Sequence, residues 1–300
     1  VVTCARGSSD SAATYAKYLI EIRIGLVVAS VGPSVSSVYG ARPKMADAVF
    51  LAISQSGRSP DLAKLAEAAR ADGALTVAFV NDAASPLAKR CEVVIPLNAG
   101  PERSVAATKS YIASLAALLQ LIAHWSADPA IASTVERLPE NLKEAFGLDW
   151  SAALPLLAQK SGLYVVGRGP GYAAAQEAAL KLKETCGLHA EAVSAAELMH
   201  GPLALAGPDL PVLLFGQRDE ALASLSELAA GLAAQGVPVI AAGPGSWGTA
   251  LTLPSLAGLH PFAEPICLVQ SLYRFAEALA RSRGRDPDQP PHLTKVTETR

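Results

Sequence analysis

The sequence predicts an α/β protein built from two doubly wound parallel-sheet halves that are related by internal duplication. Three observations carry this prediction. Short uninterrupted apolar runs recur along the 300 residues, as is typical of strands whose two faces are both covered. Helical stretches alternate with these runs. The succession of strand, glycine loop and helix occurs twice, at a nearly constant offset.

Each half contains the same series of expected elements. In order, these are a strand, a glycine loop, a helix, a second strand, a loop, a helix, a third strand and a long apolar helix. Apart from the first helix and the second loop, the first half has them at 1–4, 6–7, 49–53, 61–71, 76–80 and 106–125, and the second at 163–166, 168–169, 212–215, 220–234, 238–242 and 264–282. Residues 128–147 read as a helical linker, so we place the boundary near 145, with domains 1–145 and 146–300.

Composition restricts the class of function. A hydrophobic content of 51% supports a large core, and a net charge of −2 argues against a nucleic-acid surface. Apolar runs stay shorter than the roughly 20 residues of a membrane span, no signal peptide is visible, and a cytoplasmic protein is expected. The four cysteines are widely spaced and fit core positions in a reducing compartment. Scattered histidines give no ligand spacing, so neither a metal nor a cofactor is expected.

The segment 177–203 concentrates acid, base and amine groups in one short stretch. Lys181 and Glu184 are three residues apart and would share one face of a helix. His200 precedes Gly201-Pro202, which should end any helix and begin a turn. Two interpretations stay open from the pattern alone. Either these residues build a site, or they belong to a solvated amphipathic helix with an incidental histidine.

A serine-rich loop follows the second expected strand. Ser54, Ser56 and Ser59 supply hydroxyl groups where the chain enters a helix near Pro60, at the edge of the sheet where ligands of open α/β proteins bind. Helix amides beside hydroxyls suit a phosphate, although simple N-capping by Ser59 is the alternative. The glycine-rich run 167–171 of the second half is better explained by close strand-to-helix packing than by dinucleotide binding.

Several motifs, spread over the whole chain in order, resemble the sugar isomerase (SIS) superfamily. The resemblance is strongest to the isomerase half of glutamine–fructose-6-phosphate aminotransferases, the glucosamine-6-phosphate synthases, and extends to stand-alone glucosamine-6-phosphate deaminases. The matching stretches are 7–9, 53–57, 98–102, 108–109, 179–184, 189–192, 197–205 and 286–295. Departures from the synthase pattern include Arg58-Ser59 in place of Glu-Thr and Ala107 in place of Ser.

The resemblance implies a set of residues that bind the sugar phosphate. The phosphate group would lie on four residues of the serine loop, Ser54, Gln55, Ser56 and Ser59. Ser9 would contact the sugar near its hydroxyls, and the backbone at Val105 would line the same pocket.

The resemblance also implies catalytic roles. Glu184 would move a proton between C1 and C2 of the sugar, and Lys181 would support that carboxylate or the enediol oxygens. His200 would open the sugar ring, either within its own subunit or from across the interface of a homodimer. Lys295, in the C-terminal tail, would form a Schiff base with the keto sugar.

The implied activity is a deaminase/isomerase that converts glucosamine 6-phosphate to fructose 6-phosphate and ammonia. The 300 residues carry no recognisable glutaminase segment, which favours this reaction over glutamine-dependent synthesis. Two alternatives stay open: a non-catalytic SIS module that senses a sugar phosphate, and the isomerase fragment of a longer aminotransferase. The expected partners are a small sugar phosphate and a second copy of the chain, with neither nucleic acid nor membrane.

Overall fold

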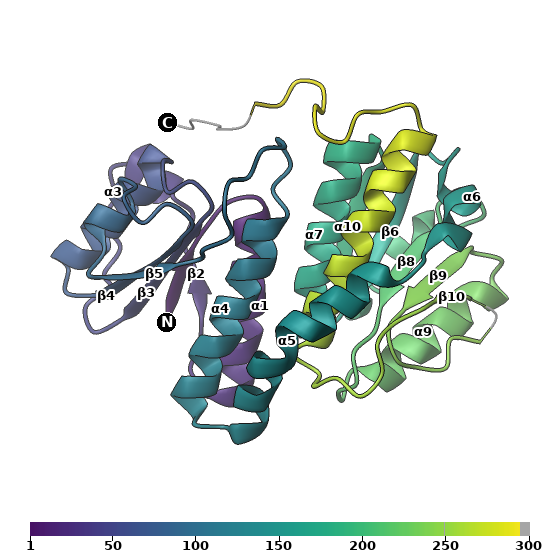
Figure 1. The fold of residues 1–300 in the computed structure, drawn as a ribbon, viewed down its shortest axis with the longest axis horizontal. Helices are drawn as coiled ribbons and strands as arrows, with labels where there is room; N and C mark the ends of the chain where they lie inside the picture. Colours follow the sequence, from purple (N-terminus) through teal and green to yellow (C-terminus); the bar gives the residue numbers. More distant parts are fainter. Residues whose placement is uncertain (249, 295–300) are drawn as a thin grey trace. The chain divides into compact units, whose positions relative to one another are not determined.

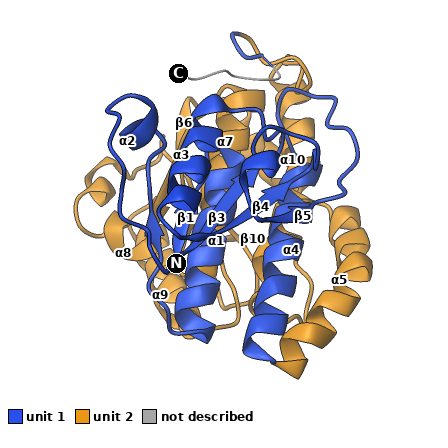
Figure 2. Ribbon diagram, turned by 90° about the vertical axis from the view of Figure 1, so that its left-hand side faces the viewer, with its two compact units in different colours: residues 1–127, 292–300 blue, residues 128–291 orange. Residues whose placement is uncertain are grey.

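The structure is a computed structural model that describes residues 1–248 and 250–294. The chain forms two compact units, which Figure 2 colours separately. Unit 1 contains residues 1–127 and, among the described residues, 292–294, and unit 2 contains residues 128–291. Each unit has one five-stranded, all-parallel sheet. This confirms the predicted fold class.

Unit 1 has the strand order β2-β1-β3-β4-β5. Its strands are β1 (Val2–Cys4), β2 (Ala29–Ser30), β3 (Val49–Ser54), β4 (Leu75–Val80) and β5 (Val93–Pro96). Its helices are α1 (Ser8–Arg23), α2 (Ser34–Ser37), α3 (Pro60–Ala71), the 3-10 turn η1 (Ala88–Arg90) and α4 (Lys109–Ser126). Buried side chains of β3, β4 and α3 form one core of this unit.

Unit 2 has the strand order β10-β9-β8-β6-β7. Its strands are β6 (Gly162–Gly167), β7 (His189–Ser194), β8 (Val212–Phe215), β9 (Val239–Ala242) and β10 (Leu251–Leu253). Its helices are α5 (Pro129–Gly147), η2 (Ser151–Ala153), α6 (Leu154–Leu157), α7 (Pro170–Cys186), α8 (Ala195–Leu198), η3 (Pro202–Leu205), α9 (Leu222–Ala234) and α10 (Glu264–Ser282). The side-by-side helices α7 and α10 are visible in Figure 1.

The two sheets share one topology. In each, the second strand of the unit lies beside the first, followed by the third, fourth and fifth on the other side. The turns after the first strands also match in detail. Gly7 has φ 56° and ψ −134°, and Gly169 has φ 57° and ψ −139°; each caps the helix that follows. This backbone conformation favours glycine because a Cβ would be strained there. The common topology and the common turn both support internal duplication.

The boundary between the two compact units lies between Ala127 and Asp128, whereas the sequence analysis placed it near residue 145. Ala127 adopts a left-handed conformation that ends α4, and Asp128 begins α5 by accepting a hydrogen bond from the Ala130 amide at 2.8 Å. Helix α5 packs against α10, and Ser271 of α10 donates a hydrogen bond to the Ala145 carbonyl at 2.8 Å. The segment read as a linker is therefore part of unit 2.

The long apolar helices are covered within their own units. Helix α4 packs against α1, and α10 packs against α7 and α5. The apolar faces of these helices are therefore no evidence for a dimer. The homodimer stays a prediction, which analytical ultracentrifugation would test. Among the described residues, no helix combines the length and the hydropathy that a membrane crossing requires.

The four cysteines are buried and carry free thiols. Burial raises the pKa of Cys4 to about 12 and that of Cys267 to about 12, because an apolar surrounding disfavours the thiolate. The expectation that the cysteines are small core residues is confirmed.

Candidate functional site

The strand order of unit 1 reverses between β1 and β3, and such a reversal opens a crevice beyond the carboxyl ends of the two strands. The loop after β1 leads into α1, and the loop 54–59 leads into α3. The serine loop therefore lies where an open α/β sheet binds its ligand. Ser9, in the first turn of α1, and Val105, in the loop after β5, also follow carboxyl ends of strands in this sheet.

The serine loop is folded by its own hydroxyl groups. Ser54 is buried, and its Oγ accepts a hydrogen bond from the Gly57 amide at 3.0 Å. Ser56 Oγ accepts one from the Arg58 amide at 3.3 Å. Gly57 has φ 61°, and a Cβ there would stand 2.2 Å from Ser85 Oγ. The loop therefore has one defined path.

Ser59 occupies the N-cap position of α3, but its side chain makes no capping hydrogen bond. Simple capping, the alternative role for this serine, is therefore absent from the structure. The amides at the start of α3 and the Ser59 hydroxyl are together the kind of donors that bind an anion at a helix N-terminus.

An ion pair that the sequence analysis did not anticipate joins the two loops of the crevice. Arg6, after β1, donates to Asp61 Oδ2 through Nε at 2.8 Å and also through its terminal nitrogen. The Asp61 side chain is fully buried in the first turn of α3, where the helix dipole favours a negative charge. This pair fixes the start of α3 against the end of β1.

The loop before α4 is held by a carboxylate rather than by the N-cap residue. Glu102 accepts hydrogen bonds from the Thr108 amide at 3.1 Å and from the Ser110 amide at 2.7 Å. The side chain of Thr108, which is the N-cap residue, makes no capping bond. Glu102 thereby anchors the segment that contains Val105.

The acid and amine groups of unit 2 lie on α7. Lys181 is only 2% exposed, and its Nζ donates a hydrogen bond to Glu184 Oε2. The same Nζ lies 3.7 Å from Oε1 of Glu177, which is fully buried. Glu184 keeps 22% of its side chain exposed. The predicted shared helix face is confirmed, and the burial of Lys181 rules out a merely solvated helix.

Two further residues, Glu177 and Tyr273, belong to this cluster and were not among the predicted site residues. Tyr273 of α10 donates a hydrogen bond to Glu177 Oε1 at 2.7 Å, so Glu177 lies between a lysine and a tyrosine. Glu177 could have been found, because it precedes Lys181 by four residues and therefore shares its helix face. Tyr273 is 96 residues away in the chain and gave no local signal.

His200 lies in an exposed turn between α8 and η3, where its amide donates to the Glu197 carbonyl at 3.0 Å. The predicted break at Gly201-Pro202 is confirmed, because Gly201 has φ 143° and η3 begins at Pro202. Lys295 lies outside the described residues. The structure thus brings Lys181 and Glu184 into contact on α7 and places His200 on a separate turn of the same unit.

In unit 2 the strand order reverses between β6 and β8, and this switch point is filled by protein side chains. Gln217, which follows β8, is fully buried and donates to the Arg168 carbonyl and to Asp219 Oδ2, both at 2.7 Å. A Cβ at Gly171 would stand 2.0 Å from Gln217 Oε1, and one at Gly167 would stand 2.4 Å from the Gly171 carbonyl. The close-packing interpretation of the run 167–171 is confirmed.

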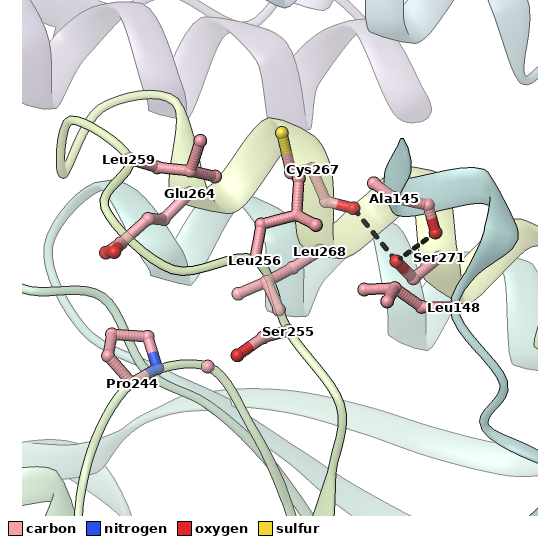
Figure 3. Close-up of a pocket in the computed structure, with 11 residues that line it drawn as sticks. Ala145, Leu148, Pro244, Ser255, Leu256, Leu259, Glu264, Cys267, Leu268 and Ser271 are labelled. Carbon is pink, nitrogen blue, oxygen red and sulfur yellow. Dashed lines mark hydrogen bonds between the residues drawn. The ribbon is translucent and has the colours of Figure 1, made fainter. Parts of the chain in front are cut away.

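A small cavity lies beneath α10 in unit 2 (Figure 3). Its volume is about 10 Å³, and its walls include Leu256, Leu268 and the buried Glu264. Such a space holds about one water molecule and is far too small for a sugar phosphate. Burial raises the pKa of Glu264, and its Oε2 accepts from the Arg218 amide. We interpret this cavity as a packing void behind the filled switch point.

The fold and the two clusters define a duplicated, doubly wound α/β protein with a serine loop in one half and a lysine–carboxylate cluster in the other. A family model described as the SIS domain matches residues 1–124 and 156–243. The chain therefore belongs to the SIS domain family, and the resemblance seen in the sequence is confirmed.

Named proteins extend this comparison. An isomerizing glutamine–fructose-6-phosphate aminotransferase from Thermotoga maritima is 32% identical over 98% of this chain and 50% of its own length. A candidate phosphosugar isomerase from Silicibacter pomeroyi DSS-3 is 45% identical, with a TM-score of 0.91 over 96% of this chain and 88% of its own. A glucosamine-6-phosphate deaminase from Thermotoga maritima shares the fold, with 18% identity and a TM-score of 0.81 over 99% and 90% of the two chains. The chain spans about half the length of the curated relatives it matches.

The Lys181 cluster yields a stability prediction. Lys181→Met should lower the free energy of unfolding by about 3 kcal/mol, because it leaves the Glu177 carboxylate buried without its cation. Adding Glu177→Gln to Lys181→Met should restore part of that loss, since the uncompensated charge is then gone. Urea unfolding of the single and double variants measures both effects, with the exposed Lys143→Met of α5 as the matched control. A Lys181→Met protein as stable as the parent would contradict the pairing.

Proposed function

We propose that this chain converts glucosamine 6-phosphate and water to fructose 6-phosphate and ammonia. The observation that carries the proposal is the partly exposed Glu184 carboxylate, held by the buried ammonium group of Lys181. A carboxylate positioned in this way can remove a proton from carbon and return it, which is the central step of aldose–ketose interconversion. Membership of the SIS family and the names of its relatives support the same class of reaction.

The proposed chemistry balances without an added oxidant. In the open-chain amino sugar, Glu184 takes the proton from C2 and delivers it to C1. The electron pair of the C2–H bond moves towards the C1 aldehyde, which becomes an alcohol, while the C2 amine becomes an imine. The amine nitrogen loses one proton as O1 gains one. A lysine amine then displaces ammonia from C2, and water hydrolyses the resulting Schiff base to the ketose and the free lysine.

The other catalytic residues take their roles in the proposal from the family resemblance. His200 would protonate the ring oxygen and open the sugar, a role that its exposed turn permits. Lys295 would displace ammonia from C2 to form a Schiff base, which water then hydrolyses to the ketose and the free amine. Lys181 would hold Glu184 in position rather than react with the sugar, since its Nζ already donates to that carboxylate.

In the proposal, unit 1 binds the phosphate group. Ser54 and Gln55 begin the serine loop, while Ser56 and Ser59 bring hydroxyl groups to the start of α3. Ser54 Oγ is engaged within the loop, so we assign it to loop shape and assign phosphate contact to the amides and the other hydroxyls. Ser9 and the backbone at Val105 would contact the sugar itself.

One observation favours a second candidate function. The chain spans about half the length of the aminotransferase relatives, so the second candidate is the isomerase part of such an enzyme, which would run the same proton transfer towards glucosamine 6-phosphate. A catalyst accelerates both directions of this equilibrium, so the two candidates are separated by the natural N-terminal sequence of the protein, which would show whether a glutaminase segment is joined to this chain. A purely regulatory SIS module would not require the Lys181–Glu184 pair and is the weaker alternative.

Glu184→Gln tests the proton-transfer role. The variant should bind the sugar phosphate as the parent does and lose at least about 100-fold in turnover, because an amide cannot accept the C2 proton. Release of ammonia and of fructose 6-phosphate from glucosamine 6-phosphate measures turnover. The exposed Glu140→Gln of α5 is the control. Parent-like turnover by Glu184→Gln would reject the assignment.

Ser56→Ala combined with Ser59→Ala tests the phosphate loop. Loss of two hydroxyl donors to a charged group should weaken sugar-phosphate binding by about 10-fold or more, while leaving binding of the unphosphorylated sugar little changed. Calorimetric titration compares the double variant with the exposed Ser133→Ala of α5. If the parent, the double variant and the control variant bound the sugar phosphate with equal affinity, the phosphate would have to bind at another place.

Lys295→Ala tests the covalent step. Borohydride should fix fructose 6-phosphate to the parent protein by reducing a Schiff base, and the variant should show no added mass. Mass spectrometry reads the outcome, with the exposed Lys143→Ala of α5 as the control. Continued trapping in Lys295→Ala would assign the imine to another lysine.

A further inference from the structure

A second cavity of unit 2 is large enough for a small molecule. It lies between the segment from α8 to η3 and one face of α9, and its volume is about 280 Å³. This volume is at the lower end of the range for small-molecule pockets, which begins at about 300 Å³. We call it the α9 groove. Its lining residues include Arg168, Met199, Leu203, Leu228, Gly231 and Leu232.

The walls of the α9 groove are mainly apolar. Leu228 and Leu232 are buried members of the unit 2 core, and Leu203 packs against that core from the η3 side. Met199 is 57% exposed although it lines the groove, so its thioether side chain is available to cover a ligand. Leu228 and Leu232 therefore form a fixed floor of the groove, and Met199 forms an adaptable rim.

A glycine keeps the groove open. Gly231 lies in the middle of α9, and a Cβ at this position would meet no atom within 4 Å. Glycine inside a helix is unfavourable relative to most residues, so a longer side chain would strengthen the helix and occupy the groove at once. The vacant position is consistent with a groove that accommodates a ligand.

One positive charge faces the groove. Arg168 follows β6, is partly buried, and makes no side-chain hydrogen bond or ion pair with the described residues. Its carbonyl, by contrast, is bound by Gln217, which fixes the backbone. Glu227 also lines the groove, but it is exposed and its charge is better screened by water. The groove is therefore lined by one partly buried cation and one exposed carboxylate.

We propose that the α9 groove is a binding site, separate from the serine loop and the Lys181 cluster, for a small organic anion with an apolar body. Leu228, Leu232 and Met199 would cover the apolar body, and the Arg168 guanidinium would bind the anionic group. This combination of one charged anchor and apolar walls is the usual build of a small-molecule site. The proposal does not depend on the reaction that the protein catalyses.

Anilinonaphthalene sulfonate has the proposed chemistry and becomes fluorescent in apolar sites, so it serves as the probe. Titration of the purified protein should give saturable binding. Gly231→Leu should weaken this binding by about 10-fold or more by filling the groove, without loss of folding. Gly147→Leu is the matched control, because Gly147 is exposed at the end of α5 and a Cβ added there also meets no atom within 4 Å.

Two charge variants test the anchor. Arg168→Gln should weaken probe binding several-fold, because it removes the attraction between the guanidinium group and the sulfonate. Glu227→Gln should strengthen binding slightly, because it removes the repulsion between the carboxylate and the sulfonate. Circular dichroism checks that each variant is folded. The proposal is overturned if the parent does not bind the probe, or if Gly231→Leu and Arg168→Gln both bind it as the parent does.

Discussion

The burial of one ammonium group constrains the whole of the candidate chemistry. Lys181 is nearly inaccessible to water, and a buried charge is tolerated only when it is paired and hydrogen-bonded. Glu177 and Glu184 provide the pairing from the same helix, and Tyr273 completes the Glu177 side from α10. The packing of α10 on α7 is therefore required to hold Glu184 in place, with only that carboxylate reaching solvent.

The serine loop achieves its shape by a different means, since it contains no buried charge of its own. Its side chains bond to its own amides, and Gly57 permits a turn that Ser85 closes from behind. The buried Asp61, paired with Arg6, then fixes the helix that follows. One cluster is thus positioned by charge pairing and the other by local hydrogen bonds, so the two should respond differently to salt and to substitution.

The sequence predicted the central strands of both sheets and missed all four edge strands. Central strands are covered on both faces and appear as continuous apolar runs, whereas β2, β5, β7 and β10 lie at sheet edges and are partly exposed. The same limit applies to the site. Lys181 and Glu184 share a helix and were predictable from spacing, but Tyr273 reaches them only through tertiary packing.

The two units have corresponding switch points, one between β1 and β3 and the other between β6 and β8. The residues at these two places differ. After β3 the chain places small hydroxyl side chains and a glycine, while after β8 it places Gln217, which is buried and bonded to the neighbouring loop. The buried Gln217 amide donates two hydrogen bonds within its own unit and would have to be displaced before a ligand could enter. The switch point of unit 2 is therefore filled by protein, and the candidate catalytic groups of this unit lie on helix α7, which begins there. This division explains why the loops after β3 and β8, at corresponding places in one topology, differ in the residues that follow Gln55 and Gln217.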